Sequence, residues 1–137
     1  ITGSKVDMIL CNPPYFKVDK QSNLNESQHY LLARHEISTN LEEICKIAQR
    51  VLKSNGRLAM VHRPERFLDI LDTMQAHNLA PKRIQFVYPK LGKEANMLLI
   101  EAIKDGSRDG LKILPPLFIH NQDGSYTPEI HEIYYGK

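Results

Sequence analysis

The sequence has no long hydrophobic run, and this absence limits the class of protein to which it can belong. No apolar stretch approaches the roughly 18 residues that a membrane-spanning helix requires, and the N-terminus has no signal-peptide pattern. Internal repeats and low-complexity tracts are absent as well. These observations predict a cytoplasmic protein without a membrane partner.

Cysteine is scarce, and the two that occur, Cys11 and Cys45, do not have the spacing of a metal site. Both lie among apolar neighbours, which favours reduced thiols in the core, with a disulfide as the alternative. No metal-ligand or catalytic-triad pattern includes His29, His77, His120 or His131. The sequence therefore predicts no metal site.

The residues that are present have the composition of one globular domain. The chain has 137 residues, 42% hydrophobic and 25% charged, which is enough for a core. Its net charge of +2 permits a polyanionic partner without requiring one. Because the first residue is isoleucine and a strand pattern follows almost at once, we expect the chain to be part of a longer protein.

The spacing of apolar residues predicts the order of the elements. It indicates a strand at 6–10, a helix from a capping box at Thr39 and Glu42 to Ser54–Gly56, a strand at 57–62, a helix beginning near Pro64, strands at 83–88 and 96–103, and a short helix after Thr127. Strand–helix alternation favours parallel pairing with right-handed crossovers, and the short linker at 89–95 favours an antiparallel return. The predicted fold class is α/β, in the order β-α-β-α-β-β with a final antiparallel hairpin.

The segment Leu10–Phe16, LCNPPYF, directly follows the first predicted strand. Its two prolines make it stiff and unable to extend a sheet, and ligands of open α/β sheets bind at the carboxyl ends of strands. There the amide oxygen of Asn12 and the carbonyl of Pro13 offer two acceptors to an NH2 group. Tyr15 offers a flat face, and stacking one base is worth roughly 1–3 kcal/mol. The alternative is a rigid turn with a surface tyrosine.

This segment resembles the (N/D)PPY motif of class I S-adenosylmethionine-dependent amino-methyltransferases, where it follows the fourth strand of a Rossmann-like sheet. The resemblance implies a catalytic site made of Asn12, Pro13, Pro14 and Tyr15, in which Asn12 also contacts the cofactor. It implies that Asn12 and the Pro13 carbonyl hold the target amine while Tyr15 stacks on its planar group. The methyl group then passes directly from sulfonium to nitrogen, so positioning and charge stabilisation dominate catalysis and no metal is needed.

Three further stretches narrow the resemblance to the bacterial tRNA(Val) adenine-N(6)-methyltransferase family: ARHE at 33–36, HRPER at 62–66 and NMLLIEAIKDG at 96–106. It implies methylation of the exocyclic amine of an adenine in tRNA. Phe16 is then expected to line the pocket, and the polar loop at 17–37 to close over the nucleotide.

The HRPER stretch supplies the other expected substrate-binding residues, His62, Arg63 and Arg66. They lie at the carboxyl end of the second predicted strand, at 57–62, on the same edge as the motif. Two arginines three residues apart can share one face there and reach phosphates. The alternative is a strand-capping histidine with solvated first-turn charges. Four further basic residues extend this edge or are plain surface charges: Lys82, Arg83, Lys90 and Lys93.

Other functions remain open at this stage. Glutamine methyltransferases of release factors and guanine methyltransferases of ribosomal RNA carry similar motifs, and a non-catalytic folding or association module is an alternative of another class. None of the seven glycines lies in a GxG pattern, whereas class I methyltransferases hold the cofactor with a glycine-rich turn after their first strand. Residues 1–137 therefore resemble only the C-terminal, substrate-side half of the domain, and we expect an exposed apolar sheet edge, self-association and no activity of this half alone.

Overall fold

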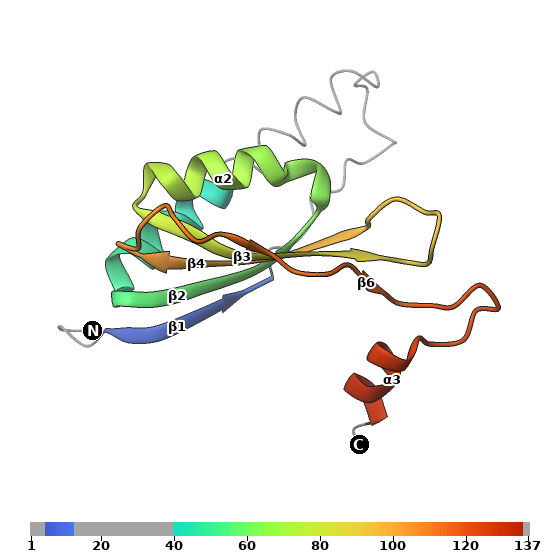
Figure 1. Ribbon diagram of the computed structural model, residues 1–137. Coiled ribbons are helices and arrows are strands. Elements are labelled where there is room, and N and C mark those ends of the chain that lie inside the picture. The colour runs from blue at the N-terminus through green and yellow to red at the C-terminus, as the bar shows by residue number, and fades with distance from the viewer. Residues whose placement is uncertain (1–4, 13–39, 136–137) are drawn as a thin grey trace, which may run out of the picture.

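The computed structural model describes residues 5–12 and 40–135. Its strands are β1 Val6–Cys11, β2 Leu52–His62, β3 Leu79–Tyr88, β4 Met97–Lys104, β5 Lys112–Ile113 and β6 Leu117–Phe118. Its helical elements are residues 40–51, η1 Pro64–Arg66, α2 Phe67–Ala76 and α3 Pro128–Tyr135. Figure 1 shows α2 lying along the sheet, β1 at the sheet's outer edge and α3 standing apart beyond β6.

The six strands form one mixed sheet in the order β1-β2-β4-β3-β5, with β6 also paired to β3. β1 and β2 are parallel, and β4 runs antiparallel to both of its neighbours. The carboxyl ends of β1, β2 and β3 therefore meet at one edge of the sheet. The expected α/β class and the β3–β4 hairpin are confirmed, but β4 lies between β2 and β3, and the short parallel strands β5 and β6 were not predicted.

One face of the sheet is covered by residues 40–51 and α2. Their apolar side chains share a single core with alternate residues of the strands: Leu41, Cys45, Ala48, Ile70 and Met74 from the helices, and Leu58, Met60, Ile84, Leu98, Ile100 and Ala102 from the sheet. Both cysteines are unpaired thiols, as predicted. Burial raises the pKa of Cys45 to about 12, so its thiol is protonated at neutral pH.

The opposite face of β1, β2 and β4 is not covered by a helix among the described residues, and we call it the uncovered face. Two rows of paired residues cross this face. Met8 pairs with Arg57, which pairs with Ile103. Leu10 pairs with Ala59, which pairs with Glu101. A hollow of about 240 Å³ on this face is lined by Leu10, Ala59, Val61, Leu99 and Leu114. The face is thus open to solvent, and its apolar hollow also borders Arg83, Gln85 and Glu101.

A carboxylate bridges two guanidinium groups on the uncovered face. Glu101 Oε1 lies 2.7 Å from Arg57 Nη1 and 4.0 Å from Arg83 Nη1. The carboxylate is largely shielded from water by its neighbours, whereas both arginines extend to solvent. Each of the three side chains comes from a different strand, so the charges on this face are locally balanced.

The first helix ends earlier than the sequence predicts. The chain is helical to residue 51, β2 begins at Leu52, and the expected stop at Ser54–Gly56 is a turn inside the strand instead. Pairing with β1 jumps from Val6↔Leu52 to Met8↔Arg57 across this turn. Leu52 is held in the sheet because it is fully buried and its carbonyl accepts a bond from Lys104 Nζ at 2.8 Å. Tertiary packing therefore overrides the local stop signal.

The remaining helix starts follow the sequence signals. Pro64 opens η1, where its missing N–H is not needed. Thr127 precedes α3, and its Oγ1 accepts the N–H of Ile130 at 3.4 Å, as expected of an N-cap. Within the described residues, none of the helices has the length and apolar character that would let it span a membrane.

Candidate active site

The first residue of the proline-rich motif lies where two strands end. Cys11 pairs with Met60 in the parallel β1–β2 ladder, so Asn12 follows at the carboxyl edge beside the last residues of β2. Asn12 is exposed, and its amide can reach a ligand from this edge. Pro13, Pro14, Tyr15 and Phe16 lie outside the described residues, as does the loop at 17–37.

His62 ends β2 at the same edge, and it is 3% exposed. Its Nδ1 accepts the N–H of Arg63 at 2.8 Å, so the proton of the neutral ring resides on Nε2. Burial lowers the pKa of His62, and the nearby Arg66 guanidinium lowers it further. The imidazole is therefore neutral at physiological pH.

The two arginines of the HRPER stretch differ in their surroundings. The Arg63 side chain is 43% exposed and its Nε lies 3.1 Å from Glu65 Oε2, so it extends to the surface. Arg66 is 6% exposed; its Nη1 lies 3.7 Å from Asp69 Oδ2, and its Nε has no hydrogen-bond partner among the described residues. Arg63 is therefore the one of the two that can reach a phosphate at the surface.

An aromatic pair lies next to these residues and was not assigned to the site from the sequence. Phe86 and His62 both pair with Leu98 from opposite sides, so the three side chains share one face. The Phe86 ring meets Phe67 edge-to-face, with centroids 5.5 Å apart at 72°. The signals that could have found this pair are Phe67 in the apolar stripe of the predicted helix and Phe86 in the alternating strand.

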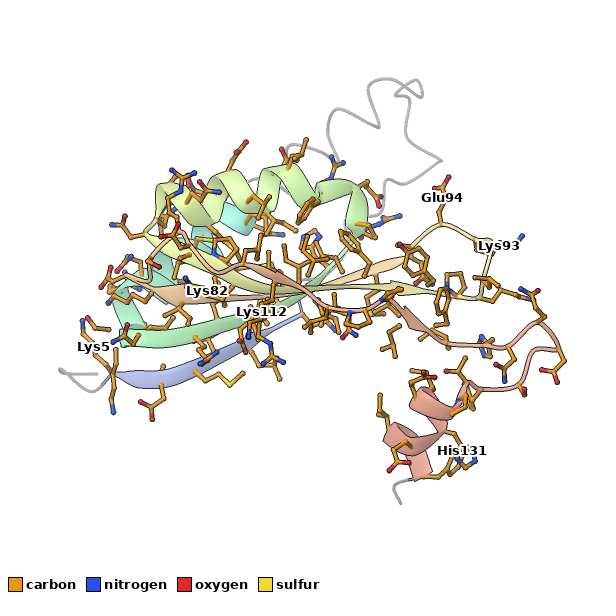
Figure 2. All side chains as sticks on the ribbon, in the orientation of Figure 1. Lys5, Lys82, Lys93, Glu94, Lys112 and His131 are labelled. Carbon is orange, nitrogen blue, oxygen red and sulfur yellow. The ribbon has the colours of Figure 1, made fainter. Side chains whose placement is uncertain are left out.

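The other basic residues do not gather at one edge. Lys82 lies near the amino end of β3, where its Nζ donates to Ser107 Oγ at 3.3 Å and to the carbonyl of Asp109. Arg83 faces Glu101 on the uncovered face. Lys93 instead points outward from the β3–β4 hairpin, beyond the opposite end of the strand (Figure 2).

The described residues make only part of a site for S-adenosylmethionine. Asn12 is a suitable polar contact at the strand edge. Among the described residues, however, the uncovered face offers one carboxylate, Glu101, and it is already paired with Arg57. The described residues also contain no group of three His, Cys, Asp or Glu side chains that could hold a metal ion.

Sequence relatives of the chain are methyltransferases. It is 30% identical over 130 residues to a tRNA1(Val) (adenine(37)-N6)-methyltransferase of Porphyromonas gingivalis strain W83, a match that covers 94% of this chain and 50% of that protein. It is 27% identical over 124 residues to the enzyme of the same description from Aliivibrio salmonicida, covering 86% and 48%. The chain thus spans about half the length of the curated relatives it matches, and no family model matches it.

Solved structures with a similar fold are described as methyltransferases as well. A protein from Agrobacterium tumefaciens described as a predicted O-methyltransferase superposes with a TM-score of 0.69 at 24% identity, over 95% of this chain and 51% of that one. A Thermus thermophilus protein assigned as a DNA modification methylase, in complex with S-adenosyl-L-methionine, gives 0.51 at 16%, over 77% and 51%. The chain therefore has the fold of about half of these methyltransferase structures and is related in sequence to the tRNA1(Val) (adenine(37)-N6)-methyltransferases.

Proposed function

We propose that this chain is the substrate-side half of a methyltransferase domain that modifies the exocyclic amine of an adenine in tRNA. The observation that carries the proposal is the place of Asn12, immediately after β1 and beside the carboxyl end of the parallel strand β2. Ligands of open α/β sheets bind at this edge. The names of the sequence relatives support the substrate, and S-adenosylmethionine supplies the methyl group in the whole protein.

Asn12 and the residues after it hold the base in this proposal. The amide oxygen of Asn12 and the carbonyl of Pro13 accept the two hydrogens of the adenine amine, which directs the nitrogen lone pair toward the methyl donor. As the nitrogen takes up the methyl group it becomes positively charged, and the same two oxygens stabilise that charge. Pro14 stiffens the segment, Tyr15 stacks on the extruded base and Phe16 lines its pocket.

The HRPER residues contact the rest of the nucleotide in this proposal. Arg63 is surface-accessible and binds a phosphate, because its pairing with Glu65 is half-exposed and easily exchanged. His62 presents a neutral imidazole at the end of β2. Arg66, which is buried against Asp69, acts on the substrate through the shape of this edge and the positive potential it adds there.

The test is methyl transfer by the full-length protein to bulk tRNA, to ribosomal RNA and to cellular protein, with labelled S-adenosylmethionine. We expect label in tRNA, and we expect Asn12→Ala to reduce the rate at least about 100-fold, as the loss of one charge-stabilising group does. Asn12→Asp keeps the acceptor and should retain far more activity. Asn96→Ala removes an exposed asparagine elsewhere and serves as the matched control.

The other outcomes assign other functions. Label in protein instead of tRNA identifies a glutamine methyltransferase. Label on guanine in ribosomal RNA identifies a ribosomal-RNA guanine methyltransferase. Equal transfer by Asn12→Ala and the unaltered protein contradicts the role of the motif. No transfer to any substrate, with cofactor bound, favours a non-catalytic association module.

A further inference from the structure

The hairpin between β3 and β4 extends beyond the edge of the sheet on which the candidate active site lies. His62, the last residue of β2, pairs with Leu98 of β4. β4 and β3 stay paired past this level, to Met97 and Val87, and the turn at 89–96 follows. Figure 1 shows this hairpin projecting past the end of β2. Its turn is therefore on the side of the sheet from which a substrate approaches the edge.

Residues 90–94, which we call the hairpin tip, are held by hydrogen bonds. Within the turn, the N–H of Lys93 donates to the Lys90 carbonyl at 3.2 Å. From the C-terminal part of the chain, Gln122 Nε2 donates to the Leu91 carbonyl at 3.1 Å. The hairpin tip is thus ordered before any ligand arrives, which lowers the entropy lost on binding.

The hairpin tip presents cations and an apolar side chain to solvent. Leu91 is 67% exposed, Lys93 is exposed and Lys90 is half-exposed. Among the described residues, neither lysine has an ion-pair partner. Glu94, the one carboxylate of the hairpin tip, points in a different direction from Lys93 (Figure 2). Two lysines and one glutamate leave a net charge of +1, which favours an anionic ligand.

An RNA strand with one base at Asn12 can reach the hairpin tip. β4 and β3 are two and three strand positions from β1, which is about 10–14 Å along the edge. Stacked nucleotides rise about 3.4 Å each, so this distance corresponds to about three to four nucleotides. Lysines bind phosphates as point charges, and apolar side chains pack against bases. The side chains of the hairpin tip match both parts of such a strand.

We propose that the hairpin tip binds the RNA about three to four nucleotides from the adenine held at Asn12, with Lys90 and Lys93 on phosphates and Leu91 against an unpaired base. This inference rests on the proposed function and adds a second contact region for the same substrate. It also assigns a role to Gln122, which holds the hairpin tip in place. The contact adds affinity for RNA and takes no part in methyl transfer.

The first test measures binding of a hairpin RNA with an adenine in its unpaired loop to the full-length protein, by fluorescence anisotropy over a range of salt concentrations. Lys90→Gln/Lys93→Gln should raise Kd and reduce the slope of log Kd against log salt by about 1.4, since each single-strand phosphate contact contributes about 0.7. Glu94→Gln removes the opposing charge and should lower Kd. Lys46→Gln/Lys112→Gln changes two exposed lysines elsewhere and should keep the slope of the unaltered protein.

The second test locates the contact along the RNA. Neutral methylphosphonates replace the phosphates three and four nucleotides from the loop adenine, on both sides. The unaltered protein should bind this RNA as weakly as Lys90→Gln/Lys93→Gln binds the natural RNA, and the variant should lose nothing further. Leu91→Ala should raise Kd about fivefold at an unchanged salt slope, because an apolar contact releases no counterions.

The outcomes separate this inference from the proposed function. An unchanged Kd and salt slope in a folded Lys90→Gln/Lys93→Gln protein overturn the hairpin tip as an RNA contact, while methyl transfer to tRNA still supports the proposed function. A reduced slope in a protein that methylates no RNA supports the contact and overturns the proposed reaction. Equal losses from this variant and Lys46→Gln/Lys112→Gln contradict a contact at the hairpin tip, because they reflect total charge alone.

Discussion

His62 is a buried residue of the proposed site, and its pKa depends on both burial and the charges around it. Its ring is enclosed at the end of β2 and lies near the positive charges of Arg66 and Arg63, which the carboxylate of Glu65 opposes. Burial and the Arg66 charge together lower its pKa. The folded protein therefore prefers the neutral imidazole more strongly than the unfolded chain does.

This difference predicts how stability depends on pH. An unfolded histidine titrates near about 6.5, so between that value and the lower folded pKa the unfolded chain binds more protons. The contribution of His62 is fully present above about pH 6.5 and is lost as the pH falls toward the folded pKa. We expect the melting temperature of the full-length protein to fall from about pH 7.5 to about 5.5, and to fall less in His62→Asn.

Asparagine suits this experiment because its Oδ1 can replace Nδ1 as the acceptor for the Arg63 N–H. His131→Asn changes an exposed histidine on α3 and should keep the slope of the unaltered protein. An identical slope in His62→Asn and the unaltered protein contradicts the assignment of the pH dependence to this ring.

The sequence predicted where the site lies in the sheet, but not how exposed its residues are. LCNPPYF after an apolar strand was enough to expect Asn12 at a carboxyl edge, because that inference needs only chain order. The contrast between Arg63 and Arg66 needs the packing of η1 and α2 on the sheet, which spacing does not encode. The pairing of Phe118 with Tyr88 was missed because Phe118 comes from a short segment whose pairing to β3 depends on distant residues.

At the scale of elements, the turn inside β2 is where local preference and packing disagree. Asn55 takes a positive φ of 67°, and a Cβ on Gly56 would lie 2.8 Å from the carbonyl oxygen of Lys53 and 3.1 Å from that of Asp7. Both near atoms belong to the backbone and cannot move aside cheaply. The turn lets Leu52 and Arg57 both pair with β1 although five positions separate them.

We expect Gly56→Ala to destabilise the protein by about 1–3 kcal/mol, as overpacking does. Asn55→Gly places glycine at a positive φ without strain and should change stability by less than about 1 kcal/mol. Urea unfolding midpoints of the two variants and the unaltered protein measure both effects. Equal midpoints for Gly56→Ala and the unaltered protein contradict the close approach of these strands.

Elements with strong periodicity were predictable and those set by pairing were not. The strands at β1, β3 and β4, the start of α2 near Pro64 and the Thr127 cap follow from apolar spacing and capping chemistry. The insertion of β4 between β2 and β3 does not, because it depends on which strand can be paired on both sides. β4 is suited to that place since every second residue is buried and the others are half-buried.

At the scale of the whole molecule, the uncovered face and the β1 edge leave apolar surface in water. Met8 is 52% and Leu10 77% exposed, on the last strand of the described sheet. Exposed edges of this kind pair with other chains unless they are covered or charged. The similar methyltransferase structures are longer than this chain, which covers about half of each, so the surface left open here is of the kind that a second half-domain can cover.

We expect the 137-residue chain, produced alone, to self-associate through this surface. The double variant Met8→Lys/Leu10→Lys should reduce association, measured by light scattering and sedimentation, because edge lysines oppose strand pairing. Leu68→Lys/Leu91→Lys changes two leucines that are comparably open but lie elsewhere, and serves as the control. A monomeric chain with one sharp thermal transition contradicts this prediction, as does equal relief of association by both double variants.

The place of β4 in the strand order also sets when the sheet can be completed during protein synthesis. β2 and β3 both leave the ribosome before the strand that joins them, and in the finished sheet they touch β4 rather than each other. Until Met97–Lys104 has emerged, a growing chain holds two strands whose inner edges have no shared partner. The centre of the sheet therefore forms only after β4 has emerged, whereas β1 and β2 can pair before it.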